Sequence, residues 1–141
     1  LVSGAFDCLS QFGALVTNGQ EELASLAYLV TMEFVSQNGA HIEAVGKTYH
    51  DALRQLAARH PALCSGVEGD GHMSALCFHQ VPDAAAFAAR MNREFCVDIS
   101  AQTYKANCRP VALTKLPLLV TEPMVGKLIA WMEQCLSEME G

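Results

Sequence analysis

The chain has 141 residues and a formal net charge of −6, with 51% hydrophobic and 17% charged residues. This length fits one domain with a substantial core, and the composition excludes a mainly disordered chain. The acidic balance, with a pI near 5.2, and the scattered lysines and arginines exclude a general nucleic-acid or anionic-membrane binder. No apolar stretch approaches the ~20 residues of a membrane span, and no signal peptide is visible. We expect a cytoplasmic protein, because most of the six cysteines lie within apolar patterns, as buried, reduced thiols do.

The N-terminal part divides into an unpatterned opening and two predicted helices. Residues 1–16 are apolar without a clear period, and we expect a linker or a remnant of a preceding domain. The domain proper is expected over residues 17–141, opening with a helix start at Thr17–Glu22. The helix that follows is apolar nearly all round, so it should be heavily buried or lie at an interface. Asn38-Gly39 is predicted to end it.

The second helix is predicted from about His41 to His60, because apolar residues recur there at helical spacing. His60 is interpreted as a helix-end residue near the negative end of the dipole, and Pro61 stops the helix. The remaining elements are short. Strands are predicted over residues 64–68, 73–79, 96–101 and 111–116, and a third helix over 83–95. Thr121 is predicted to cap the last helix, with Pro123 in its first turn.

The order ααββαββα predicts an α+β fold: a small, mainly antiparallel sheet of about three or four strands covered by helices. The turn at Gly69-Asp70-Gly71 precedes the apolar run from Met73. Two glycines so close together suggest positive φ or close packing. Phosphate-binding loops place the glycines between a strand and a following helix, so this turn is not expected to hold a phosphate.

Other candidate chemistry is sparse. The five histidines include no His-x-x-x-His pair, so a metal site is not expected. The six cysteines form no Cys-x-x-Cys pair, which favours buried, reduced thiols over a disulfide scaffold. A cysteine nucleophile would need a base beside it in space. Lys47 and Lys127 should be solvated, whereas Lys115 is either an outward strand residue or the edge of a cleft.

Three segments, in order and at fitting intervals, resemble a known family. They are Ala57–Pro61, Val67–Met73 and Leu113–Glu122. They resemble the C-terminal part of class III aminotransferases, the fold-type I pyridoxal-phosphate enzymes that include ornithine-type and glutamate-1-semialdehyde-type members. In that family a Val-Arg-Gly-x-Gly-Leu-Met turn starts a small-domain strand, and a Leu-Arg-Leu-x-Pro-Pro-Leu-like segment introduces the final helix. The resemblance covers roughly Thr17 to the end of the chain.

The resemblance implies two site residues. Thr17 matches the threonine of the family's Thr-x-Gly-Gly-Asn-Pro segment, which contacts the cofactor phosphate of the neighbouring subunit. Here Asn-Pro is replaced by Glu21-Glu22, whose charges would repel a phosphate. Lys115 stands where some members of the family place an arginine that binds the substrate carboxylate. A lysine cannot donate two parallel hydrogen bonds to a carboxylate as an arginine does. The resemblance also implies that the intact enzyme is a homo-oligomer.

The family's Schiff-base lysine and the aspartate that pairs the pyridine nitrogen lie upstream of the Thr segment. This chain has no lysine there. We therefore expect the C-terminal domain of a class III aminotransferase or aminomutase-like enzyme, packed on a large domain that binds pyridoxal phosphate. Alone it should bind no cofactor and be inactive. The alternatives are a free-standing α+β binding or dimerisation module and, third, a cysteine-dependent enzyme.

Overall fold

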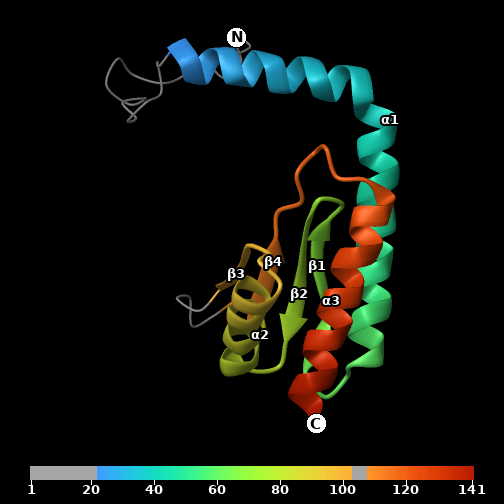
Figure 1. Cartoon of the computed structure of the whole chain (residues 1–141), viewed down its shortest axis with the longest axis vertical. Helices are drawn as coiled ribbons and strands as arrows, with labels where there is room; N and C mark the ends of the chain where they lie inside the picture. The colour runs from blue at the N-terminus through green and yellow to red at the C-terminus, as the bar shows by residue number, and fades with distance from the viewer. Residues whose placement is uncertain (1–21, 103–107) are drawn as a thin grey trace. The chain divides into compact units, whose positions relative to one another are not determined.

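The computed structural model describes residues 22–102 and 108–141 (Figure 1). The elements are α1 (Glu22–Arg59), β1 (Cys64–Asp70), β2 (Met73–Phe78), α2 (Val81–Glu94), β3 (Ile99–Gln102), β4 (Val111–Thr114) and α3 (Glu122–Glu140). The predicted α+β class and the order of strands and helices are confirmed. Backbone contacts separate two units, residues 1–38 and 39–141. The predicted division into residues 1–16 and 17–141 stays a prediction.

The two helices predicted before Pro61 form one element, α1, with an interruption at Asn38. This residue has non-helical angles, φ −117° and ψ 17°. Its side-chain amide donates to the carbonyl of Phe34 at 2.8 Å, so it competes with the backbone for that acceptor. The sequence located the irregularity correctly, but Asn38-Gly39 interrupts the helix where we predicted its end.

The helix of the first unit, residues 22–38, carries large apolar side chains that are exposed. Leu23 is 74% exposed and Tyr28 71%, and these two are typical of the segment. The others are Leu26, Leu29, Val30, Met32 and Val35. Apolar residues therefore cover most of the circumference of this helix, as its sequence predicted.

The sheet of the second unit has four antiparallel strands in the order β1-β2-β4-β3. A tight hairpin joins β1 to β2, with Asp70 opposite Met73. Gly69 (φ +88°) and Gly71 (φ +49°) both have positive φ in this turn, as predicted. The register shifts between Cys64 and Gly66, which is a β-bulge in the edge strand β1. The glycine turn is therefore a hairpin turn.

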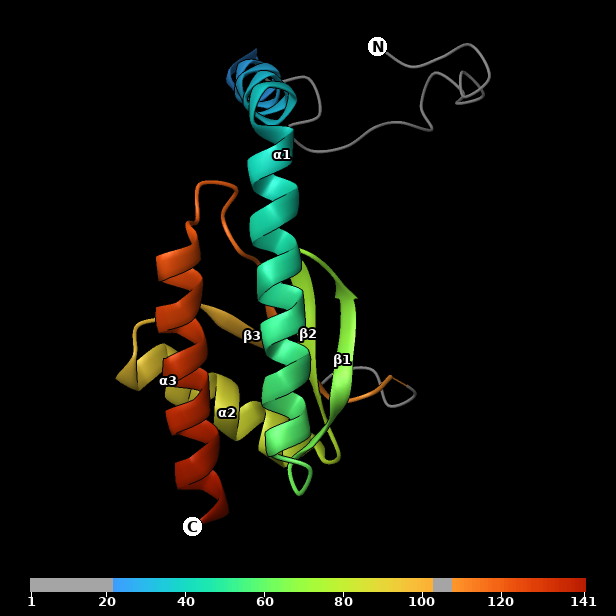
Figure 2. The ribbon, with the colours of Figure 1, turned by 90° about the vertical axis from the view of Figure 1, so that its right-hand side faces the viewer.

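The hydrophobic core lies between the sheet and the helices of the second unit. Its largest members are fully buried: Tyr49, Leu53 and Leu56 on α1, Leu76 and Phe78 on β2, Phe87 and Met91 on α2, and Met132 and Leu136 on α3. Their helical spacing explains why the sequence predicted most of them. The Gly39–Arg59 part of α1 and α3 lie side by side and run in the same direction (Figure 2).

One local expectation about a helix end needs correction. Thr121 occupies the N-cap position of α3, and its carbonyl accepts the first hydrogen bond of the helix from Val125 at 3.0 Å, but its side chain makes no capping hydrogen bond. His60 directly follows the last residue of α1, as predicted, and it is 4% exposed and contacts two glutamates of α3. Among the described residues, no helix is long and apolar enough to cross a membrane.

Candidate functional site

Lys115 follows β4 directly and lies at the rim of a hollow of about 320 Å³. The side chain is exposed, and it makes no hydrogen bond or ion pair with another described residue. The hollow is lined by Val97, Asp98, Ser100, Leu113, Thr114, Leu116, Pro117 and Leu128. Lys115 was predicted to be either an outward strand residue or the edge of a cleft. The structure shows both features, because the side chain is exposed to solvent and lies at the edge of the hollow.

The backbone after Lys115 is fixed by the hairpin turn. The amide of Leu116 donates to the carbonyl of His72 at 3.1 Å, which ties this segment to the β1–β2 turn. The β1–β2 hairpin turn is itself attached to α1, since the His72 Nε2 atom lies 3.0 Å from the carbonyl oxygen of Ile42. The turn therefore positions the Lys115 segment through backbone and imidazole contacts.

Buried polar side chains lie under this end of the sheet. Burial raises the pKa of Tyr49 well above its ordinary value, and the neighbouring Thr114 hydroxyl offsets this only in part. Burial, and then the nearby His41, lower the pKa of His72. The Tyr49 hydroxyl and the His72 Nδ1 atom have no hydrogen-bond partner among the described residues. Tyr49 is thus held as a neutral phenol and His72 is biased toward its neutral form, which suits a structural role for both.

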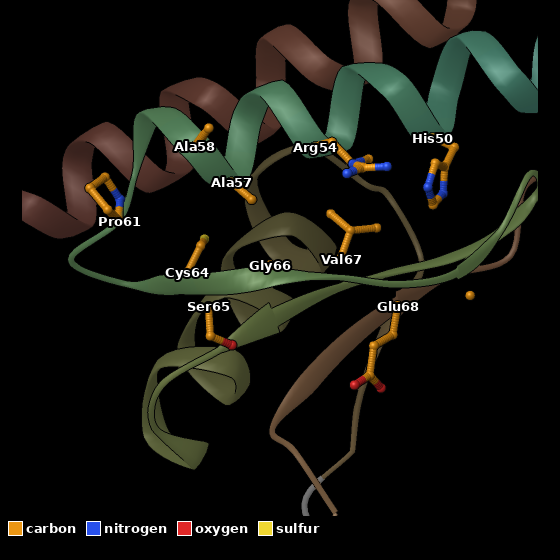
Figure 3. A pocket seen from close by; sticks show the side chains of 11 residues that line it. His50, Arg54, Ala57, Ala58, Pro61, Cys64, Ser65, Gly66, Val67 and Glu68 are labelled. Atoms are coloured by element: carbon orange, nitrogen blue, oxygen red, sulfur yellow. The ribbon is translucent and has the colours of Figure 1, made fainter.

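A second concave region lies between α1 and β1 (Figure 3). It has a volume of about 650 Å³ and contains His50 and Arg54. His50 Nδ1 lies 3.0 Å from Oγ of Ser74, and this hydroxyl donates to the carbonyl of Gly71 at 2.8 Å. The sequence pattern assigned no role to either partner, because 24 residues separate them.

A charged cluster joins the ends of α1 and α3. His60 Nε2 lies 2.9 Å from Glu133 and Nδ1 lies 2.9 Å from Glu140. Arg59 also donates to Glu133, through Nε at 2.8 Å and Nη2 at 2.5 Å. The Arg59 hydrogen bond, and to a lesser degree His60, hold the pKa of Glu133 below its ordinary value. This cluster joins the ends of two helices, and none of its residues lines the hollow beside Lys115 or the region that contains His50 and Arg54.

The cysteines give little support to a cysteine-dependent enzyme. Burial raises the pKa of the Cys64 thiol to about 12 and that of Cys135 to about 11, and it also raises the pKa of Cys77. Thiols held protonated in this way are poor nucleophiles. The five cysteines within the described ranges are all free, and these ranges contain no cluster of three or more His, Cys, Asp or Glu side chains that could hold a metal.

No family model and no curated protein matches the chain, but solved structures do. A lysine aminotransferase from M. tuberculosis matches 76% of this chain with 24% of its own, at 20% identity and a TM-score of 0.63. An acetylornithine aminotransferase from Elizabethkingia anophelis matches 82% with 30% of its own, at 18% identity and a TM-score of 0.64. A phospholyase from Arthrobacter, in complex with phosphoethanolamine, matches 82% with 28% of its own, at 20% identity and a TM-score of 0.68.

The fold is that of one part of an aminotransferase chain. This confirms, at the level of the fold, the resemblance found in the sequence. The chain spans only 24–30% of the length of these three structures. The aminotransferase-like fold also occurs in the phospholyase, so the fold alone leaves the reaction open.

The described part of this aminotransferase-like fold does not by itself fit pyridoxal phosphate. Its three lysines are exposed: Lys47 is ion-paired with Asp51 at 2.5 Å, Lys127 lies 4.8 Å from the ring of Trp131, and Lys115 stands at the open rim described above. A lysine that carries a cofactor needs an enclosed site with partners for the ring and the phosphate. Thr17 lies outside the described residues, so its proposed contact with a cofactor phosphate stays a prediction.

Proposed function

We propose that this chain is the C-terminal small domain of a pyridoxal-phosphate-dependent class III aminotransferase. The observation that carries the proposal is the match of folds: most of this chain superposes on about a quarter of each aminotransferase. The three sequence segments that resemble the family support the same assignment. In the intact enzyme this domain would pack on the cofactor domain, help to close the substrate cleft and exclude water.

Lys115 is the residue we propose to face the substrate. Its ammonium is exposed at the rim of the 320 Å³ hollow, and no described carboxylate is paired with it. A substrate carboxylate would therefore meet an available positive charge. A lysine acts as a point charge and does not donate two parallel hydrogen bonds, so it would orient the carboxylate less strictly than an arginine would.

The cofactor would be held mainly by residues outside this chain. The Schiff-base lysine and the partner of the pyridine nitrogen are absent from the described residues, and the contact proposed for Thr17 depends on a neighbouring subunit. Pyridoxal phosphate, when bound in the intact enzyme, supplies the electron sink for amino-group chemistry. We propose that the isolated chain binds no cofactor and is inactive.

Two experiments test this function. Sequencing the gene upstream of the Leu1 codon should reveal an in-frame large domain with a lysine motif. The isolated chain, mixed with pyridoxal phosphate and reduced with borohydride, should show no stoichiometric adduct by mass spectrometry. A stoichiometric adduct at one lysine would contradict the inactive-domain proposal. The intact protein should then be assayed for both amino-group transfer and phosphate elimination, because the phospholyase has the same fold.

A second candidate function is a free-standing binding or dimerisation module. The exposed apolar residues of the helix over residues 22–38 favour it, because such a surface is normally covered by a partner. A start codon close to Leu1, with no large domain upstream, would favour this candidate over the aminotransferase domain.

A further inference from the structure

A groove of about 650 Å³ lies between α1 and the edge strand β1 (Figure 3). His50, Arg54, Ala57 and Ala58 line it from the helix, and Pro61 closes one end. Residues 64–69 line it from the strand. It shares no lining residue with the hollow beside Lys115, so any ligand here is separate from the substrate proposed above.

Arg54 has no counter-ion in the described chain, whereas every other arginine does. The others are ion-paired with glutamates: Arg59 with Glu133, Arg90 with Glu94 and Glu138, Arg93 with Glu94, and Arg109 with Glu68. Asp51 is near enough to interact electrostatically with Arg54, but Lys47 holds its carboxylate at 2.5 Å. The Arg54 guanidinium group therefore lines the groove and makes no hydrogen bond to a described residue.

The only acidic residue that lines the groove does not neutralise Arg54. Figure 3 shows the Glu68 side chain on the face of β1 that points away from α1. Its carboxylate lies 3.5 Å from Arg109, on that opposite face. The interior of the groove, between α1 and β1, thus carries the positive charge of Arg54, although the protein as a whole carries a charge of −6.

His50 adds a second polar group to this side, and its orientation is fixed. The single hydroxyl proton of Ser74 goes to the carbonyl of Gly71, so Ser74 Oγ can only accept from His50. His50 Nδ1 therefore carries a proton, and Nε2 is the ring atom left without a partner among the described residues. Figure 3 shows the ring beside Arg54, one helical turn away on the same face of α1.

We propose that this groove binds a small ligand that carries a carboxylate or phosphate group on a short apolar body. The planar Arg54 guanidinium would bind two oxygens of the anion. His50 Nε2 would bind a third group, as a donor when the ring is protonated or as an acceptor from a ligand hydroxyl. Ala57, Ala58 and Val67 would contact the apolar body. The volume of about 650 Å³ is within the usual range for small-molecule sites.

Titrations of the ¹⁵N-labelled 141-residue chain, followed by NMR, test this proposal. The probes are hexanoate, inorganic phosphate and, as the charge-reversed control, hexylammonium. We expect saturable shifts of the Arg54 Nε–H and of the β1 amides with at least one anion, at a dissociation constant of about 1–10 mM. Tighter binding of hexanoate would identify a carboxylate ligand, and tighter binding of phosphate would identify a phosphate ligand.

Matched variants assign the binding to the groove. Arg54→Gln should weaken binding about tenfold or more, because a charge-assisted hydrogen bond is lost. Arg54→Lys keeps the charge without the fork and should be intermediate. Arg93→Gln, a matched change at an exposed arginine on α2, should bind like the wild type. Equal affinity of Arg54→Gln and wild type, equal shifts with hexylammonium, or no saturation with either anion would each overturn the proposal.

Discussion

Gly46 lies against Gly71, which brings the backbone of α1 into contact with the hairpin turn between β1 and β2. A Cβ atom built at position 46 would lie 3.2 Å from Cα of Gly71 and 3.4 Å from the backbone nitrogen of His72. These neighbours are backbone atoms, so they cannot rotate away as a flexible side chain would. The contact explains why the helix has a glycine where alanine would favour helicity.

Gly46→Ala should therefore destabilise the domain, by about 1–2 kcal/mol, because overpacking outweighs the gain in helix propensity. Gly126 in α3 provides the matched control, since nothing lies within 4 Å of a Cβ built there. Gly126→Ala should stabilise by about 0.5–1 kcal/mol. Urea denaturation of both variants measures the difference. A stabilised Gly46→Ala variant would show that the turn can move away from the helix.

His60 should be important for stability, because it is buried and contacts Glu133 and Glu140 through its two ring nitrogens. Both contacts can be hydrogen bonds donated by the ring only when it is protonated. His60→Ala should cost about 1–3 kcal/mol, through lost hydrogen bonds to charged groups. His79→Ala, at an exposed histidine that contacts a backbone carbonyl, should cost far less. Equal losses in thermal unfolding would contradict a special role for the cluster.

The Glu133 carboxylate should make stability dependent on acidic pH. Its pKa is lower in the folded protein than its ordinary value of 4.5, chiefly because of Arg59. The unfolded chain therefore takes up a proton first, and the stabilisation is present above about pH 4.5 and is lost as the pH falls through the folded pKa. Glu133→Gln should lower stability at pH 7 and flatten this dependence. An unchanged slope between pH 5 and pH 3, measured by urea denaturation, would refute it.

His72 should act in a higher pH range. Its folded-state pKa is lowered from the ordinary 6.5 by burial and by His41. The unfolded chain therefore binds a proton in preference to the folded one below about pH 6.5, so stability falls as the solution becomes more acidic. His72→Gln, which keeps a donor for the Ile42 carbonyl, should reduce this fall. The measurement is the difference between variant and wild type at pH 7.5 and at pH 5.5.

The helix over residues 22–38 should cause the isolated chain to self-associate. Leu26 is 57% exposed and Leu29 65% exposed, and burying such side chains between two molecules is favourable. The double change Leu26→Glu and Leu29→Glu should shift the chain toward monomer in sedimentation velocity. Met124→Glu, which changes another exposed apolar residue outside this helix, should leave association unchanged. A monomeric wild-type chain at high concentration would contradict the prediction.

The sequence by itself determined the order of elements, the hairpin turn at Gly69 and Gly71, and most core positions on the helices. These follow from local signals, because helical periodicity and glycine conformational freedom act over a few residues. The three family-like segments likewise predicted the aminotransferase-like fold. The same local signals misplaced helix ends, as at Asn38, where a single non-helical residue did not stop the helix.

Only the tertiary structure decided which polar groups meet. His50 and Ser74 are 24 residues apart, and His60 lies 73 residues from Glu133 and 80 from Glu140. The close packing of Gly46 on Gly71 likewise depends on how α1 lies over the sheet. No periodicity encodes such pairs, because each requires the packing of distant elements around the common core. For the same reason, only the tertiary structure shows that Arg54, unlike the other arginines, has no counter-ion among the described residues.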